Sequence, residues 1–267
     1  MKKFLDINDV TICIDDTDED KKPIILIPGL ASSKEAMFFI RDALKDDYRV
    51  ITLDVRGHGE STHPLSYTLE DHAEDLQEII GKLELENVDV LGDSMGSYIA
   101  LRGAQLNCNN IDHLILLCTN PSSKVSSVFR LLGEKGLEYP KISRREMFQA
   151  IYDSYLSPTT LRKIASGELE MSRFASSGNI GELNEEEKRA ELKSISNFDN
   201  SIDYDKVKCK TLVIGAEYDR INPYELGKEV ADGIEGAEFC LIKDAGHMVA
   251  YEKTEELLTV IKEFFKV

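Results

Sequence analysis

Short apolar runs alternate with stretches in which apolar residues recur every three or four positions, from about residue 20 to the end of the chain. A short β-branched run bounded by turn residues predicts a strand, whereas a spacing of three or four predicts an amphipathic helix. Strands are predicted at residues 4–8, 10–14, 23–27, 49–53, 88–91, 111–118, 211–214 and 239–242. Helices are predicted at residues 33–44, 68–83, 95–106, 224–234 and 254–265.

Strands that alternate with helices in this way indicate βαβ units, and such units build a mostly parallel sheet with helices on both faces. The first two strands are separated only by Asp9, so they predict an antiparallel pair at the edge of that sheet. The sequence therefore predicts an α/β fold with one antiparallel N-terminal edge.

Residues 121–205 break the alternation, because they contain no convincing strand. Helix-like patterns cover residues 125–132, 146–155, 159–165 and 185–192. A helical insert between two strands of a parallel sheet is typical of a lid. We therefore expect a core made of residues 1–120 and 206–267, with a helical cap at residues 121–205.

The most informative motif is Gly92-Asp93-Ser94-Met95-Gly96, which matches G-x-S-x-G between a predicted strand and a predicted helix. A serine on such a tight turn holds its hydroxyl clear of the sheet, and the strained backbone needs small neighbours. The helix that follows directs its N-terminal N–H groups to the same place, where an oxyanion would form. Ser94 is therefore a candidate nucleophile.

A serine needs a base, and the base needs a carboxylate that fixes its tautomer. His247 and His58 both follow predicted strands, at the sheet edge where catalytic groups collect. Asp219 lies just past the strand at 211–214 and is the preferred acid. Three other carboxylates could act as the acid instead: Glu217, Asp244 and Asp205.

These motifs resemble the α/β-hydrolase superfamily, in which nucleophile, acid and base follow in the order Ser94, Asp219, His247. Ile27-Pro28-Gly29-Leu30 resembles the oxyanion loop of that family, and residues 54–61, DVRGHGES, resemble its D-x-R-G-x-G-x-S loop. The resemblance implies that His247 is the base and that His58 is structural. It also implies oxyanion donors at the backbone N–H groups of Leu30 and Met95, with no metal or organic cofactor.

The substrate is less well determined, because a fold does not fix a function. Aromatic residues of the expected cap that could line an apolar pocket are Phe129, Phe148, Tyr152 and Phe174. We expect hydrolysis of a small or medium carboxylic ester, lactone or thioester through an acyl-serine. Two alternatives are carbon–carbon bond hydrolysis or lyase chemistry with the same triad, and a non-catalytic ligand-binding relative.

The composition of the chain limits the classes of molecule that it is expected to bind. The net charge of −17, from 49 acidic and 32 basic residues, disfavours nucleic acid and anionic membranes as partners. The first ten residues lack a long apolar stretch, so we expect no signal peptide, and five scattered cysteines suggest a reducing, cytoplasmic location. Residues 122–146 differ from the rest of the chain, because they contain six Lys and Arg against three Glu. The acidic total therefore does not argue against an anionic substrate that binds beneath the cap. The oligomeric state is not determined by the sequence.

Overall fold

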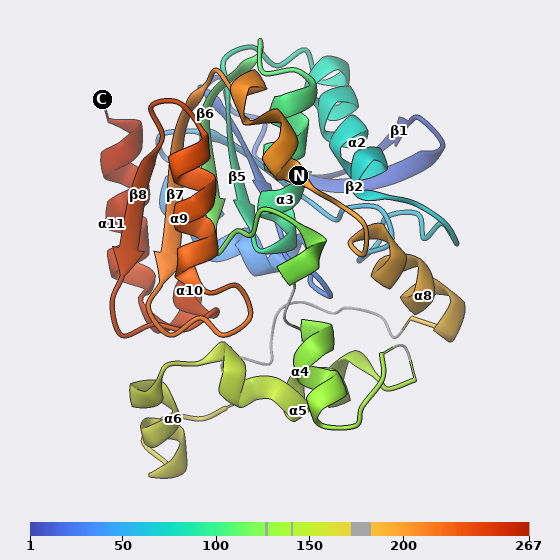
Figure 1. The fold of residues 1–267 in the computed structure, drawn as a ribbon. Helices are drawn as coiled ribbons and strands as arrows, with labels where there is room; N and C mark the ends of the chain where they lie inside the picture. Colours follow the sequence, from blue (N-terminus) through green and yellow to red (C-terminus); the bar gives the residue numbers. More distant parts are fainter. Residues whose placement is uncertain (126–127, 140, 172–182, 267) are drawn as a thin grey trace.

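The computed structural model describes residues 1–125, 128–139, 141–171 and 183–266. Within these ranges the strands form one eight-stranded sheet in the order β1-β2-β4-β3-β5-β6-β7-β8 (Figure 1). Their bounds are β1 Lys2–Ile7, β2 Val10–Asp16, β3 Pro23–Ile27, β4 Arg49–Leu53, β5 Val88–Asp93, β6 Ile111–Leu117, β7 Lys210–Ala216 and β8 Glu238–Ile242. Strand β2 pairs antiparallel with β1 and β4, and the remaining pairs are parallel. The predicted sheet with its antiparallel N-terminal edge is confirmed.

Helices cover both faces of the sheet, with α2, α3 and α9 on one face and α1 and α11 on the other (Figure 1). The helices of this core are η1 Lys34–Met37, α1 Phe38–Leu44, α2 Leu69–Lys82, α3 Met95–Leu106, α9 Tyr224–Gly233, α10 Val249–Glu252 and α11 Thr254–Phe265. Between β6 and β7 the chain forms η2 Ser123–Val125, α4 Val128–Glu134, α5 Arg144–Tyr155, α6 Pro158–Ala165, α8 Glu185–Ser194 and η3 Asn200–Lys206.

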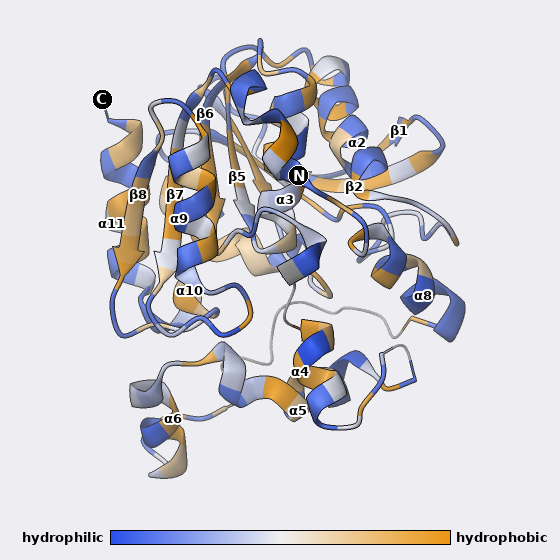
Figure 2. Ribbon diagram, viewed as in Figure 1, coloured by the Kyte–Doolittle hydropathy of each residue, from blue (hydrophilic) through white to orange (hydrophobic). Residues whose placement is uncertain are grey.

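The central strand β5 shows why both faces are covered. Its side chains alternate across the sheet, so Val88 and Val90 pack in the cluster under α2 and α3, whereas Leu91 packs in the cluster under α1 and α11. All three side chains are fully buried. Apolar residues follow the strands and the inner helix faces, and polar residues follow the outer faces (Figure 2).

The helix predicted at residues 33–44 is divided into a 3-10 turn, η1, and the α-helix α1. The 3-10 turn is bound to the core by a buried ion pair that the local pattern does not reveal. The backbone N–H of Lys34 donates to Asp54 Oδ1 over 2.7 Å, and Lys34 Nζ donates to Asp54 Oδ2 over 2.8 Å. These bonds hold the first turn against the end of β4.

Within the inserted segment, helices α4, α5 and α6 lie below the sheet, beyond the carboxyl ends of the strands (Figure 1). It is attached there by the backbone, since Met248 N donates to Tyr155 O over 3.0 Å. Glu252 adds a second link by accepting from Ser157 N over 2.9 Å. No helix in the described part of the chain is long and apolar enough to cross a membrane.

Candidate active site

Ser94 occupies a strained turn between β5 and α3, with φ 53° and ψ −116°. A positive φ is unfavourable for a residue with a side chain and persists only where the surroundings enforce it. Here the enforcement is crowding. A Cβ on Gly92 would lie 2.1 Å from the carbonyl oxygen of Gly96, and a Cβ on Gly96 would lie 2.2 Å from that of Ile27.

The first prediction tests this crowding. Gly96→Ala should destabilise the protein by about 1–3 kcal/mol or more, because the added methyl group must push α3 away from the end of β3. Thermal and denaturant unfolding measure the change. The matched control is Gly81→Ala in α2, where a Cβ would meet nothing within 4 Å. This control should be neutral or stabilising by up to about 1 kcal/mol, and equal losses in both variants would refute the crowding argument.

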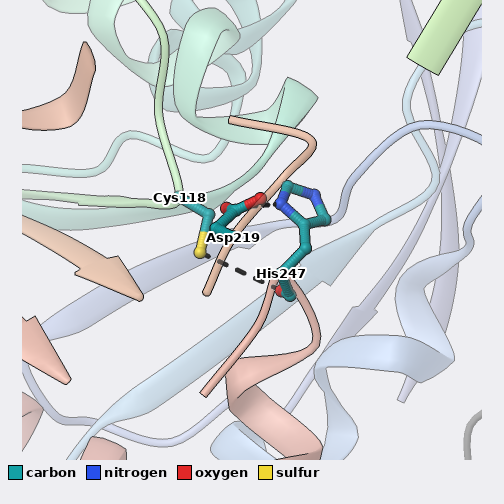
Figure 3. Close-up of side chains that lie close together, drawn as sticks. All are labelled: Cys118, Asp219 and His247. Carbon is teal, nitrogen blue, oxygen red and sulfur yellow. Dashed lines mark hydrogen bonds and ion pairs between the residues drawn. The ribbon is translucent and has the colours of Figure 1, made fainter. Parts of the chain in front are cut away.

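His247 and Asp219 meet beside this turn, as predicted from their positions after β8 and β7. His247 Nε2 lies 2.9 Å from Ser94 Oγ, and His247 Nδ1 lies 2.7 Å from Asp219 Oδ2. Figure 3 shows the carboxylate facing the imidazole ring. The second oxygen of Asp219 accepts from the backbone N–H groups of Ile221 and Asn222, both over 2.8 Å. The carboxylate is therefore fixed on both sides.

This arrangement selects one tautomer of the histidine. Asp219 is an acceptor, so His247 Nδ1–H donates to it and the lone pair of Nε2 faces the serine hydroxyl. Burial by itself lowers the pKa of His247, but the charge and hydrogen bond of Asp219 outweigh burial and leave the pKa above its ordinary value of 6.5. The imidazole is thus prepared to accept a proton.

The competing carboxylates are engaged elsewhere. Glu217 accepts from the backbone N–H of Asp244 over 2.9 Å. Asp244 forms an ion pair of 3.6 Å with Lys253, and Asp205 lies exposed in η3. Asp219 is therefore the carboxylate that the fold brings to His247.

The two backbone groups expected to bind an oxyanion are both free. Leu30 and Met95 line the same cavity as Ser94. Among the described residues, the N–H of neither donates a hydrogen bond. The loop before Leu30 approaches the nucleophile closely, since a Cβ on Gly29 would lie 3.3 Å from Ser94 Cβ.

Asp93, directly before the nucleophile, is a charged group whose importance the sequence did not reveal. It lines the cavity with Ser94 and His247. Burial, aided by the charge of Asp219, raises the pKa of the Asp93 carboxyl to about 6, although the nearby His247 acts in the opposite direction. The negative form of Asp93 in turn raises the pKa of His247.

A cavity of about 620 Å³ lies between the core and the inserted helices. Phe129 and Phe148, two of the predicted pocket residues, line it. Tyr152 does not, which corrects the prediction for this residue. The physical reason is a kink at Ile151, whose φ of −127° and ψ of 18° interrupt the spacing that would place Tyr152 over Phe148. Phe174 lies outside the described residues.

Other residues of the wall were missed because they lie near one another only in the folded chain. Tyr155 packs edge-on against the ring of His247, with 5.6 Å between centroids. The part of the wall formed by α5 also contains polar side chains, those of Arg144, Arg145 and Gln149. The local excess of positive charge around residues 122–146 was the only available signal for the two arginines.

His58 joins the inserted helices to the core. The imidazole is fully buried, and Nε2 lies 2.9 Å from Glu191 Oε1 of α8 and 3.2 Å from the backbone nitrogen of Ala31, next to Leu30. Glu191 also accepts hydrogen bonds from Arg144 and from the hydroxyl of Tyr139. Burial acts to raise the pKa of Glu191, but these partners hold it at about 2.

The second prediction concerns this buried carboxylate. Glu191→Gln should lower the free energy of unfolding by about 3–5 kcal/mol at neutral pH, because Arg144 would lose its buried counter-charge. Since the pKa of Glu191 falls from 4.5 to about 2 on folding, the carboxylate stabilises the fold above about pH 4.5 and the contribution is lost as the pH falls towards 2. Denaturant unfolding at a series of pH values measures the difference between variant and wild type.

The control for this prediction is Glu185→Gln, which removes an exposed i,i+4 pair with Arg189 from the same helix. Such a pair contributes about 0.3–0.5 kcal/mol. A loss in Glu191→Gln no larger than in this control would contradict the buried network.

Three groups of potential metal ligands occur among the described residues, and one of them, Cys118 with Asp219 and His247, overlaps the site. Figure 3 shows the Cys118 sulfur directed at the backbone oxygen of His247, 3.9 Å away. Burial raises the pKa of this thiol well above its ordinary value, which keeps it protonated. In the other two groups, Lys34 and Lys22 already neutralise the carboxylates. These donor sets suit hydrogen bonding and ion pairing better than metal binding.

The sheet, the turn at Ser94 and the paired His247 and Asp219 are features of one class of protein. The chain belongs to the family described as alpha/beta hydrolase fold, which it matches over residues 22–254. The predicted superfamily and fold are thereby confirmed.

Three individual proteins that the chain resembles have sequence identities below 30%. The chain is 28% identical to the AB hydrolase superfamily protein YisY of Bacillus subtilis, over 96% of this chain and 95% of that protein. It is 25% identical to the proline iminopeptidase PfmaB of Pestalotiopsis fici, over 98% of each chain. A solved hydrolase from Pseudomonas aeruginosa PA01 has the same fold, with a TM-score of 0.85 at 21% identity, over 100% of this chain and 98% of that one.

Proposed function

We propose that this chain is a serine hydrolase that cleaves a small or medium carboxylic ester, with lactones and thioesters as close variants, through an acyl-serine intermediate. The observation that carries the proposal is the hydrogen-bonded series Asp219–His247–Ser94 at the wall of the cavity. Residues 121–205 act in this proposal as a cap over the cavity. Hydrolase relatives that match nearly the whole chain support the general activity.

The geometry supports a two-step reaction. His247 Nε2 removes the proton of Ser94 Oγ, which attacks the acyl carbon and forms a tetrahedral intermediate. The negative oxygen is bound by the free N–H groups of Leu30 and Met95, each contributing about 3 kcal/mol to the transition state. His247 then protonates the leaving group, and a water activated by the same imidazole releases the acid.

The cavity wall favours an acyl group with a modest apolar part. Apolar and aromatic side chains form most of the wall, and its volume of about 620 Å³ is that of a small-molecule site. Phe129, Phe148 and Met147 come from the inserted helices, and Phe39 and Tyr251 from the core. An ester carbonyl can therefore meet Ser94 while its substituents lie against both parts of the chain.

The third prediction identifies the nucleophile. p-Nitrophenyl acetate and butyrate should be turned over with a burst of p-nitrophenol that equals the enzyme concentration. Ser94→Ala should abolish the burst and lower kcat by roughly four to six orders of magnitude. Stopped-flow absorbance measures both quantities.

Ser32→Ala is the matched control, because Ser32 lines the same cavity, whereas the ring of His247 is hydrogen-bonded to Asp219 and Ser94. Its burst should be intact and its kcat within a few-fold of the wild type. Hydrolysis that persists in Ser94→Ala would assign the nucleophile elsewhere. A wild type without burst or turnover would eliminate the ester proposal and favour carbon–carbon bond chemistry with the same three residues.

The fourth prediction concerns pH. Catalysis requires neutral His247, whose pKa lies above 6.5, so kcat/KM should fall as the pH drops through a midpoint above that value. Asp93→Asn removes a negative charge that raises the pKa of His247 and should move this midpoint to lower pH. The pH profiles of variant and wild type are compared with one neutral ester. Asp205→Asn, an exposed carboxylate, should leave the midpoint in place, and an unmoved midpoint in Asp93→Asn would exclude electrostatic coupling between Asp93 and the base.

A further inference from the structure

Two consecutive arginines at the start of α5 form part of the cavity wall opposite the core. Arg144 is buried, with 8% of its surface exposed, and Nη2 donates to Glu191 Oε1. Its Nε and Nη1 atoms are also buried, and they have no hydrogen-bond acceptor in the part of the chain that the structure describes. Within the described residues, part of the guanidinium of this cavity-lining arginine therefore lacks an acceptor.

This is an unusual arrangement. Most buried polar groups in proteins have a partner, and a buried donor without one costs about 1–3 kcal/mol, more when the group is charged. A guanidinium has five N–H donors in a fixed plane that matches the geometry of a carboxylate. Glu191 accepts from Nη2 of Arg144, and a shift of the side chain that exposes the buried Nη1 would let a substrate carboxylate accept from that atom.

Arg145 adds positive charge to the same wall. It is exposed, and within the described ranges it forms neither a hydrogen bond nor an ion pair. The other four cations of residues 122–146 are each paired with an acid: Lys124 with Asp199, Arg130 with Glu134, Lys135 with Asp153, and Lys141 with Glu138. None of the four lines the cavity. Of the six cations, only Arg144 and Arg145 therefore line the cavity, and of these two Arg144 is paired with Glu191 whereas Arg145 carries its charge without a partner among the described residues.

The opposite end of the cavity carries charge of the other sign. Asp93 lies next to Ser94 and lines the cavity from the core side. Charges in a partly dry cavity interact more strongly than in water. An anionic group is therefore repelled from the nucleophile and attracted to α5, which orients a substrate whose carboxylate is distant from the reacting carbonyl.

We propose that the cavity selects esters that carry a second, free carboxylate remote from the scissile bond, and that Arg144 and Arg145 bind this carboxylate. The inference rests on the proposed ester hydrolysis and names its substrate class. The reaction is unchanged by it: water adds across the acyl–oxygen bond, and the remote carboxylate takes no part in bond making or breaking.

The experiment compares matched esters at low ionic strength. One pair is p-nitrophenyl hydrogen pimelate and p-nitrophenyl heptanoate, in which the carboxylate is in the acyl part. The other pair is 3-carboxyphenyl heptanoate and phenyl heptanoate, in which it is in the alcohol part. In one of the two pairs, kcat/KM for the anionic ester should exceed that for the neutral ester by about tenfold or more, mostly through KM. That pair shows which half of the substrate lies against α5.

Two variants assign the preference to the arginines, with the ratio of kcat/KM values as the readout. Arg144→Lys keeps the charge beside Glu191 but removes the planar fork, and it should reduce the ratio by about tenfold. Arg145→Gln should reduce it by about two- to fivefold, with a loss that shrinks as salt is added. Arg130→Gln is the charge-matched control on the exposed surface of α4 and should leave the ratio unchanged.

Equal kcat/KM values within both pairs, or a ratio unchanged in Arg145→Gln and in folded Arg144→Lys, would overturn the inference. Thermal unfolding reports whether Arg144→Lys is folded, and exposed Arg145 supplies a test that does not depend on it. If no ester is turned over, the proposed function fails separately. Monomethyl pimelate and methyl heptanoate are then compared as ligands of Ser94→Ala by thermal shift. Stabilisation by the anionic ester alone, lost when Arg145→Gln is added, supports the anion site, and equal shifts reject it.

Discussion

The close contact between the start of α3 and the end of β3 is the constraint on which the site depends. Because Gly96 has no Cβ, the helix can begin within contact distance of Ile27. This contact holds Ser94 in a backbone conformation that residues with side chains avoid, and it brings Met95 to the cavity that Leu30 also lines. The turn that carries the nucleophile and Met95 is therefore fixed by backbone packing.

The other half of the site, formed by Asp219 and His247, is held by hydrogen bonds to a charged side chain. Asp219 is fixed by two backbone N–H groups, and this rigidity is passed on to His247. Glu191 links the inserted helices to the core in a similar way, since its Oε1 contacts both Arg144 of α5 and His58 of the core. His58 in turn contacts the loop that contains Leu30. The inserted helices and the candidate oxyanion loop thus share one buried network, in which each charge has a counter-charge nearby.

Much of the fold followed from local patterns. The alternation of strands and amphipathic helices, and the single residue between the first two strands, were enough to predict a parallel sheet with an antiparallel edge. The helix at residues 33–44 was predicted as continuous, whereas its first turn is a 3-10 turn bound to Asp54, twenty residues further along the chain. Tyr152 was expected in the pocket as an aromatic residue of the insert, and the kink at Ile151 lies directly before it. Local periodicity and residue type reveal neither the distant contact nor the kink.

The sequence by itself identified Ser94 as the candidate nucleophile and limited the candidate base and acid to a few residues. The reason is that a nucleophile turn and the ends of strands are local features, and in a parallel sheet they lie at one edge. The sequence also shows an excess of cations in residues 122–146, at the start of the insert. Only the tertiary structure decided which carboxylate faces His247, and which cations face the cavity, because burial and counter-charges depend on residues far apart in the chain. Four of those six cations are paired with acids away from the cavity. The other two line the cavity that contains Ser94: Arg144, which is paired with buried Glu191, and Arg145, which has no partner among the described residues.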